Sequence, residues 1–331
     1  MRATTAGHET VERPPALLRA PRVRLAALPT PLQSAPRLSD ALGIEVWVKR
    51  DDLTGVGLGG NKARKLEFLL ADARAWGADV VVTGGGPGSN HIQLTATAAG
   101  RLGLDCVLVL YGHRPRPEPL NLRLARLAGA QVRFTGDAVR SSVDAGIDAS
   151  VARLERNGSR PYRIGRGGAT PVGCLGYVEA AFELDGQLAA MPEVVLLATG
   201  SCGTQAGLLL GSALLRAPWR LLGVSVSRPV AECRERITAL ARGAASVLGV
   251  AVELPAPEVG DGIGPGYGRP SRAGQAAASL AARTEGLFLD PVFTAKAMAA
   301  LVAEAEAGSL TGPVVFLHTG GTGGLAGKGK P

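Results

Sequence analysis

Strand-like and helix-like segments alternate along most of this 331-residue chain. A short apolar run at 106–110 precedes a helical pattern at 121–127, and the same order returns at 131–134 and 143–157. Parallel strands are joined by long crossovers, usually helices, because a tight hairpin connects only antiparallel neighbours. The alternation therefore predicts an α/β fold of parallel sheets flanked by helices.

A double-glycine turn at Gly59-Gly60 precedes Lys62, and residues 65–73 continue as a helical pattern with an apolar stripe. Glycines let the backbone turn tightly and approach a ligand closely. A buried lysine loses its proton readily and becomes an amine that can form a Schiff base. Taken alone, the string is equally consistent with an ordinary solvated turn.

A second glycine-rich loop, at 84–88, lies between a strand-like run at 79–83 and a helical pattern at 94–99, and it ends in Ser89-Asn90-His91. Free N–H groups and the positive end of a helix dipole would face an anion there. Ser and Asn are also among the commonest helix caps, so a well-capped helix explains the same residues.

Two further loops repeat this design. The strand-like run at 194–198 leads into Thr199–Thr204 and a helical pattern, and the run at 314–317 leads into His318–Gly324. Small residues, hydroxyls and N–H groups at 199–204 outline a phosphate cradle. The loop is neither a P-loop nor the dinucleotide-binding G-x-G-x-x-G sequence.

Together the four loops resemble those of pyridoxal-phosphate enzymes of the tryptophan synthase β-like type, fold type II. Within that group the chain resembles the D-cysteine desulfhydrase and 1-aminocyclopropane-1-carboxylate deaminase family. The resemblance runs from Leu28 to the HTGGT segment, about nine-tenths of the chain. Other matching stretches lie at 49–53, 176–181, 264–268 and 290–294.

The resemblance implies a two-domain α/β fold with pyridoxal 5'-phosphate in the cleft between the domains. We expect a large cofactor-binding domain of residues 1–59 and 166–331, of which 1–20 form a loose arm, and a small inserted domain of residues 60–165. The sequence marks neither domain boundary sharply.

Composition agrees with an enzyme of the reduced cytoplasm. The formal net charge is +8, but arginines are scattered and aromatics are only 4%, which favours a solvated basic surface over a nucleic-acid partner. No apolar run has the length of a membrane span, and the first twenty or so residues lack a signal peptide's apolar stretch. The four cysteines are widely spaced, so we expect no disulfide framework and no metal. We expect a homodimer and a small amino-acid substrate.

Lys62 matches the family's Schiff-base lysine, which holds the cofactor and, once released, moves protons at the substrate α-carbon. Lys65 fits a phosphate contact, although a surface lysine fits the spacing equally well. Thr319 matches the hydroxyl that faces the pyridine nitrogen, a neutral partner that suits elimination better than transamination. The family's phosphate loop matches Ser201, Cys202, Gly203 and Thr204. Most relatives have glycine where Cys202 stands, and we interpret Cys202 as a packed thiol rather than a reactive one.

The second loop matches the substrate side of the family's site. Ser89 corresponds to the serine over the cofactor, and Asn90 to the residue that hydrogen-bonds the cofactor's ring hydroxyl. The N–H groups of 89–91 suit a substrate carboxylate, while the imidazole of His91 is interpreted as structural rather than as a base. Gly88 replaces the family's usual glutamine, which widens the pocket.

Phe293 is the most consequential departure from the family. Relatives usually carry tyrosine there, and in the deaminases an acidic residue stands at the position of Thr294. We expect both residues on the substrate side, and their identity disfavours opening of a cyclopropane ring. Tyr267 remains a candidate catalytic acid or stacking group, with a packed loop tyrosine as the alternative.

The leading hypothesis is therefore a lyase that performs β-elimination on D-cysteine or a related amino acid, giving pyruvate, ammonia and the leaving group. A diverged sibling is the alternative, catalysing β-replacement, racemisation or a deaminase-like reaction. Its motivation is the set of departures at Gly88, Cys202 and Phe293. A third hypothesis is a protein that holds the cofactor without turnover, and the retention of Lys62 and the matching polar residues argues against it.

Overall fold

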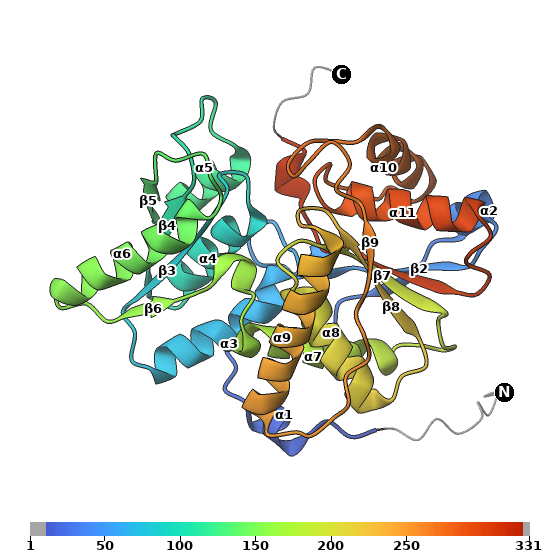
Figure 1. Ribbon diagram of the computed structural model, residues 1–331, viewed down its shortest axis with the longest axis horizontal. Coiled ribbons are helices and arrows are strands. Elements are labelled where there is room, and N and C mark those ends of the chain that lie inside the picture. The colour runs from blue at the N-terminus through green and yellow to red at the C-terminus, as the bar shows by residue number, and fades with distance from the viewer. Residues whose placement is uncertain (1–10, 327–331) are drawn as a thin grey trace.

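The computed structural model describes residues 11–326, which form two sheets (Figure 1). The six-stranded sheet has the order β1-β2-β10-β7-β8-β9 and the four-stranded sheet the order β5-β4-β3-β6. Every pairing is parallel except that of β1 with β2. The strands are β1 Leu32–Ser34, β2 Val46–Lys49, β3 Val80–Gly85, β4 Asp105–Leu110, β5 Gln131–Phe134, β6 Pro161–Arg163, β7 Val194–Thr199, β8 Arg220–Ser225, β9 Glu258–Asp261 and β10 Val314–Leu317. The predicted parallel α/β architecture is confirmed.

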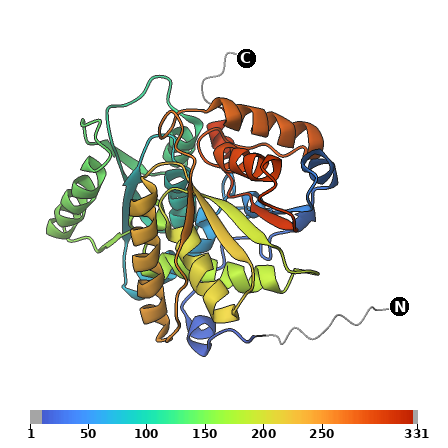
Figure 2. The ribbon, with the colours of Figure 1, turned by 45° about the vertical axis from the view of Figure 1, so that its right-hand side comes forward.

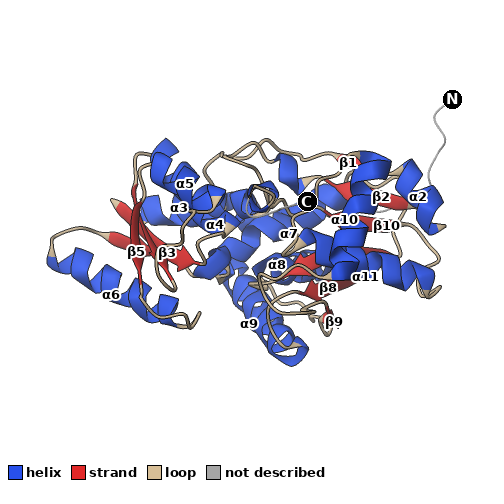
Figure 3. Ribbon diagram, turned by 90° about the horizontal axis from the view of Figure 1, so that it is seen from above, coloured by secondary structure: helices blue, strands red, loops and turns tan. Residues whose placement is uncertain are grey.

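Helices surround both groups of strands, which Figure 3 shows apart from one another in red. The helices are α1 Pro15–Arg19, α2 Pro36–Leu42, α3 Lys62–Ala75, α4 Asn90–Arg101, α5 Leu120–Leu127, α6 Ser142–Arg156, α7 Pro171–Asp185, α8 Gly203–Leu215, α9 Val230–Leu248, α10 Arg272–Glu285 and α11 Thr294–Glu306. Short 3-10 helices are η1 Asp51–Leu53, η2 Arg166–Gly168 and η3 Thr322–Gly324. No helix within 11–326 is long and apolar enough to cross a membrane.

The central strand β7 explains why the larger sheet is covered on both faces. All of its residues are buried, and successive side chains point to opposite faces. Val195 and Leu197 pack in a core with α7, α8 and α9, while Val194 and Leu196 pack with α2, α10 and α11. Figure 2 shows α10 and α11 grouped together, apart from α9. A continuous apolar run is the expected sequence of such a strand.

The smaller sheet is built in the same way. On one face, Val81 packs in a core with residues of α3, α4 and α5. On the other face, Val80 and Val82 pack against Val143 and Ile147 of α6. The carboxyl end of β3 leads into the second glycine-rich loop, so the sheet positions that loop and the start of α4.

Several element boundaries differ from the expected ones. The expected helix at 94–99 begins at Asn90, because the Ser89 hydroxyl accepts a hydrogen bond from the His91 N–H at 3.2 Å and caps the helix. Helix α3 begins at Lys62, so this lysine is the first helical residue rather than part of the turn. The strand at 314–317 has the expected bounds.

Part of the expected loose arm is packed. Residues 15–19 form α1, and Leu17 is buried in the core of the larger sheet. Arg13 also donates a hydrogen bond to Glu179 of α7 at 3.2 Å. The expectation is therefore wrong for residues 15–19, and residues 1–10 lie outside the described part of the chain. The domain boundaries near residues 60 and 165 stay a prediction.

A buried guanidinium joins three elements beneath the start of α3. Arg64 is 1% exposed and donates two hydrogen bonds to Asp51, at 2.9 and 2.8 Å. It donates two more to Glu183 of α7, at 2.9 and 2.7 Å. Lys49 of β2 also contacts Glu183, at 2.5 Å. Two carboxylates thus compensate two buried cations, and the position of α3 is fixed relative to β2 and α7.

Replacement of Arg64 by methionine should lower the free energy of unfolding by about 3–5 kcal/mol, because Asp51 and Glu183 would keep buried charges without their guanidinium. The control is Arg163→Met, whose partner Asp148 is exposed, and which should cost less than about 1 kcal/mol. Urea unfolding measures both values. Equal losses in the two variants would show that the buried network carries no special weight.

Acid should destabilise the protein through Glu183. Burial would raise the pKa of this carboxyl, but the hydrogen bonds and charges of Arg64 and Lys49 outweigh burial and lower the pKa to about 2. Between its ordinary value of 4.5 and about 2, the unfolded chain therefore binds the proton more readily. The contribution of Glu183 to the free energy of unfolding is fully present above pH 4.5 and is lost as the pH falls toward 2. Glu183→Gln should flatten this dependence in urea titrations from pH 2 to 6, and the exposed Glu155→Gln should not.

Candidate active site

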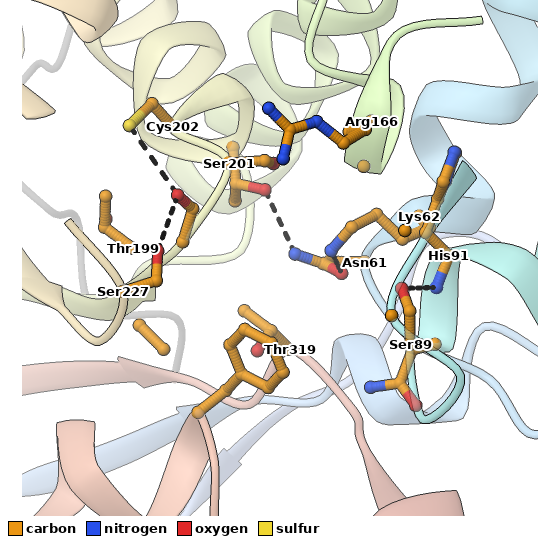
Figure 4. Close-up of a pocket in the computed structure, with 18 of the residues that line it drawn as sticks. Asn61, Lys62, Ser89, His91, Arg166, Thr199, Ser201, Cys202, Ser227 and Thr319 are labelled. Atoms are coloured by element: carbon orange, nitrogen blue, oxygen red, sulfur yellow. Dashed lines mark hydrogen bonds between the residues drawn. The ribbon is translucent and has the colours of Figure 1, made fainter. Parts of the chain in front are cut away.

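A pocket lies between the two sheets, at the carboxyl ends of β3, β7, β8 and β10 (Figure 4). Residues 84–86 and 89–91 line it from the smaller sheet, and residues 198–202 and 319–320 from the larger. Ligands of α/β proteins bind at such strand ends. The lining includes these residues expected from the sequence: Lys62, Ser89, Asn90, His91, Ser201, Cys202, Thr204, Tyr267, Phe293 and Thr319.

Glycine is required at the turn that delivers Lys62. Gly59 and Gly60 have φ of +73° and +120°, and a Cβ on Gly59 would lie 1.9 Å from the carbonyl oxygen of Asp52. Lys62 Nζ donates to Asn61 Oδ1 at 2.7 Å, and Asn61 Nδ2 donates to Thr204 Oγ1 at 3.0 Å. The side chain of Asn61 therefore connects the lysine amine to the 199–204 loop.

The electrostatics favour a neutral amine at Lys62. Its side chain faces the pocket and is otherwise enclosed, and this burial holds its pKa well below the ordinary value of 10.5. The charge of Lys65 lowers the pKa further, whereas Asp290 opposes the shift. An unprotonated lysine is a nucleophile and a base, which is the chemistry expected of this residue.

The loop before α8 has the properties of an anion site. Residues 201–204 include the start of α8, whose first N–H groups have no partner within the helix. Lys65 is fully buried beside this loop, and burial lowers its pKa to about 8. Lys65 Nζ lies 3.4 Å from the Gly167 carbonyl oxygen and 3.1 Å from the position of a Cβ on Gly203. Lys65 thus packs behind the loop at Gly203, and neither of these two residues lines the pocket.

Cys202 occupies an unusual backbone conformation. Its φ of +73° lies in the left-handed region that favours glycine, the residue that the resemblance leads one to expect here. The thiol is buried, and a hydrogen bond with Cys233, followed by burial itself, raises its pKa. A protonated, enclosed thiol is a poor nucleophile, in agreement with the interpretation of a packed residue.

The Ser89–His91 segment offers fewer free N–H groups than expected. Ser89 N–H donates to the Gly86 carbonyl at 3.0 Å and His91 N–H to the Ser89 hydroxyl at 3.2 Å. The N–H of Asn90, at the first turn of α4, has no partner within the helix. Asn121 Nδ2 donates to Asn90 Oδ1 at 2.9 Å and to the Gly88 carbonyl at 2.8 Å. Asn121 therefore holds the Asn90 side chain by its oxygen and leaves its NH2 group available.

The imidazole of His91 lies in the core rather than in the pocket. The Thr83 hydroxyl donates to the Ile164 carbonyl at 2.9 Å, so we assign it as acceptor from His91 Nε2–H, also at 2.9 Å. The Thr95 hydroxyl lies 3.4 Å from Nδ1. Burial lowers the pKa of His91 to about 3, so the ring is neutral. This geometry agrees with a structural histidine. His91 belongs to the pocket lining, but its ring nitrogens contact Thr83 and Thr95.

Tyr267 and Phe293 form an aromatic wall, with ring centroids 6.1 Å apart in an edge-on arrangement. Thr294 does not belong to this wall. Its hydroxyl donates to Asp290 Oδ1 at 2.8 Å, and its N–H donates to the same atom at 3.0 Å. Because Thr294 is fully buried at the start of α11 and does not line the pocket, its expected place on the substrate side is wrong.

Thr319 faces the pocket from the loop after β10 (Figure 4). Its carbonyl accepts the Asn61 N–H at 3.0 Å, which ties this loop to the turn before Lys62. Sequence reasoning missed several other lining residues, among them Tyr111, Arg140, Arg166, Ser227, Arg228 and Arg236. They come from separate segments, and only folding brings them together.

Comparisons with known proteins agree with this geometry. The family described as "Pyridoxal-phosphate dependent enzyme" matches residues 23–320. The chain is 42% identical over 314 residues to a D-cysteine desulfhydrase of Klebsiella pneumoniae (strain 342), covering 92% of this chain and 95% of that protein. A D-cysteine desulfhydrase of Salmonella choleraesuis (strain SC-B67) is also 42% identical, with the same coverage.

Solved structures give the same result. A crystal structure described as an ACC deaminase homologue superposes with a TM-score of 0.90 at 39% identity and covers 97% of both chains. Threonine deaminase isoform 2 from Solanum lycopersicum has a TM-score of 0.68 at 19% identity, covering 95% of this chain and 84% of its own, and shows the shared fold alone. The expected resemblance and the fold type II architecture are confirmed, and the chain belongs to the family of pyridoxal-phosphate dependent enzymes.

Proposed function

We propose that this enzyme is a lyase that eliminates a β-substituent from a small amino acid, as D-cysteine desulfhydrases do by name. The observation that carries the proposal is the enclosed amine of Lys62, whose pKa is lowered and which faces a pocket lined by hydroxyls and helix N-termini. Relatives named D-cysteine desulfhydrase, alike over 92% of the chain, support the choice of reaction.

The residues present fit pyridoxal 5'-phosphate. Arg236 lines the pocket beside the loop 201–204, with buried Lys65 behind that loop, so a phosphate there would meet a guanidinium and helix N–H groups. A side chain on Gly203 would intrude on Lys65 and Ala169. The Thr319 hydroxyl would face the ring nitrogen and the Asn90 NH2 group the ring oxygen. The bound cofactor supplies an electron-withdrawing ring that makes the α-proton of an amino acid acidic.

The chain's own residues then divide the work. The neutral amine of Lys62 removes the α-proton, and Asn61 holds that amine by one hydrogen bond. The Asn90 N–H and the Ser89 hydroxyl orient the substrate carboxylate. The Cβ–sulfur bond breaks with its electron pair on sulfur, and burial raises the pKa of Tyr267, so its phenol is protonated and able to donate to the leaving thiolate. Water completes the reaction to pyruvate and ammonia.

Deaminase-like chemistry is the second candidate, because a structure described as an ACC deaminase homologue matches at a TM-score of 0.90. Phe293 offers no phenol, and the Thr294 hydroxyl and N–H both donate to the Asp290 carboxylate, so neither could assist ring opening. β-Replacement and racemisation remain alternatives that share the same lysine and carboxylate contacts. A non-catalytic cofactor-binding role is the least favoured.

We also propose a cytoplasmic homodimer. The four cysteines are free, which suits a reduced compartment. Gel filtration with light scattering tests the dimer directly.

Removal of the Lys62 amine should eliminate covalent attachment of the cofactor. In Lys62→Ala, the visible absorbance of lysine-linked cofactor and its fixation by borohydride should disappear, and pyruvate formation should fall by about 10² to 10⁴-fold. Lys296→Met, which removes a buried lysine that does not line the pocket, should keep the linkage. A cofactor still fixed by borohydride in Lys62→Ala would assign the linkage to another residue.

A substrate panel tests the reaction itself. D-cysteine and 3-chloro-D-alanine should release pyruvate, whereas 1-aminocyclopropane-1-carboxylate should release negligible 2-oxobutanoate, because thiolate and chloride leave without strong acid assistance. Phe293→Tyr should alter rate or substrate preference without restoring deamination. The Lys62→Ala protein corrects for uncatalysed release. If 2-oxobutanoate forms as fast as pyruvate does from D-cysteine, the proposed reaction is wrong.

A further inference from the structure

The pocket wall carries an excess of positive charge. Besides the neutral amine of Lys62, its described lining includes four arginines, Arg140, Arg166, Arg228 and Arg236, and no aspartate or glutamate. The expected cofactor phosphate and the substrate carboxylate account for some of this charge. The hydrogen-bond and ion-pair partners of each arginine show which guanidinium is available to bind an additional anion.

Three of the four arginines have other assignments. Arg166 donates to both oxygens of Asp144, at 3.0 and 2.6 Å. Arg228 pairs with Glu232 and donates to the Gly200 carbonyl at 3.3 Å. Arg236 donates to the Ser201 carbonyl at 3.3 Å and therefore lies at the phosphate loop.

Arg140 is different. It stands just before α6, on the side of the smaller sheet, and reaches across to the larger one. Its guanidinium carbon lies 3.9 Å from the centroid of the Tyr267 ring, and one N–H donates to the Ser227 carbonyl at 3.4 Å. Among residues 11–326 it has no carboxylate partner. A guanidinium stacked on a ring keeps its edge donors free, and such donors match a carboxylate in paired hydrogen bonds.

We propose that Arg140 binds an anionic group on the β-substituent of the substrate. The inference rests on the proposed β-elimination and names its substrate class: amino acids whose leaving group carries a carboxylate or sulfonate. The α-carboxylate is assigned to the Asn90 end and the phosphate to 201–204, whereas Arg140 stacks on Tyr267, which we place at the leaving group. The reaction is unchanged: the α-proton goes to Lys62, the Cβ–sulfur bond breaks with its pair on sulfur, and water releases pyruvate and ammonia.

An isosteric pair of substrates tests the proposal. S-carboxymethyl-D-cysteine and S-carbamoylmethyl-D-cysteine differ in charge but hardly in shape. The wild-type enzyme should prefer the carboxymethyl compound by about tenfold or more in kcat/KM, because a paired ionic hydrogen bond is lost with the amide. In Arg140→Met this ratio should fall to about one. The control Arg153→Met removes an exposed arginine of α6, the helix that follows Arg140, and should keep the wild-type ratio.

Turnover of D-cysteine, the ratio of kcat/KM values and cofactor binding distinguish failure of the proposed function from failure of the inference. If D-cysteine yields no pyruvate, the proposed function fails first. If D-cysteine is turned over but the wild-type ratio is near one, the inference is overturned. An equal loss for both compounds in Arg140→Met, with the ratio unchanged, would assign Arg140 to the α-carboxylate. Weaker cofactor binding in Arg140→Met with an unchanged ratio would assign it to the phosphate, and either result also overturns the inference.

Discussion

The contact between Arg64 and its two carboxylates positions the rest of the site. Arg64 lies two residues after Lys62 in the first turn of α3, so any shift of its guanidinium moves the lysine as well. Asp51 fixes it to the segment after β2, and Glu183 fixes it to α7. The start of a helix is ordinarily prone to fraying because its first N–H groups lack partners. Here an ionic network in the core removes that freedom.

The electrostatic character of the pocket follows from which charged and polar groups line it and which do not. Carboxylates lie behind the wall, at Asp144, Glu232 and Asp290, while cations, hydroxyls and N–H groups face inward. A pocket of this kind attracts anions and holds them without competition from its own acids. In the proposed complex the neutral hydroxyl of Thr319, rather than a carboxylate, would face the ring nitrogen, and such a partner would suit elimination.

Much of the fold could be predicted from the sequence, because periodicity records burial. The run at 194–198 is apolar throughout since both faces of β7 are covered, and the loop after it is rich in glycine because a helix begins there. Glycines mark the turn before Lys62, whereas Thr319 was expected from the resemblance of its loop to the family's. Arg140 and Asn121 could not, since their roles depend on contacts between distant segments. The expected role of Thr294 is wrong because its hydroxyl donates to the Asp290 carboxylate and accepts from the Asp290 N–H, and the linear sequence does not distinguish such a contact from a ligand contact.

The two hydrogen bonds that link Lys62 through Asn61 to Thr204 have a consequence for cofactor recognition. The side chain of Asn61 contacts both the lysine amine and the loop that would receive the phosphate. Binding at the two ends of the cofactor would therefore be coupled. An anion bound at this loop would lie beside Thr204, whose hydroxyl accepts a hydrogen bond from Asn61, and Asn61 in turn holds the lysine amine. An aldehyde without a phosphate would lack the contact with this loop. Reaction of Lys62 with an aldehyde would then depend on what the loop at 201–204 holds.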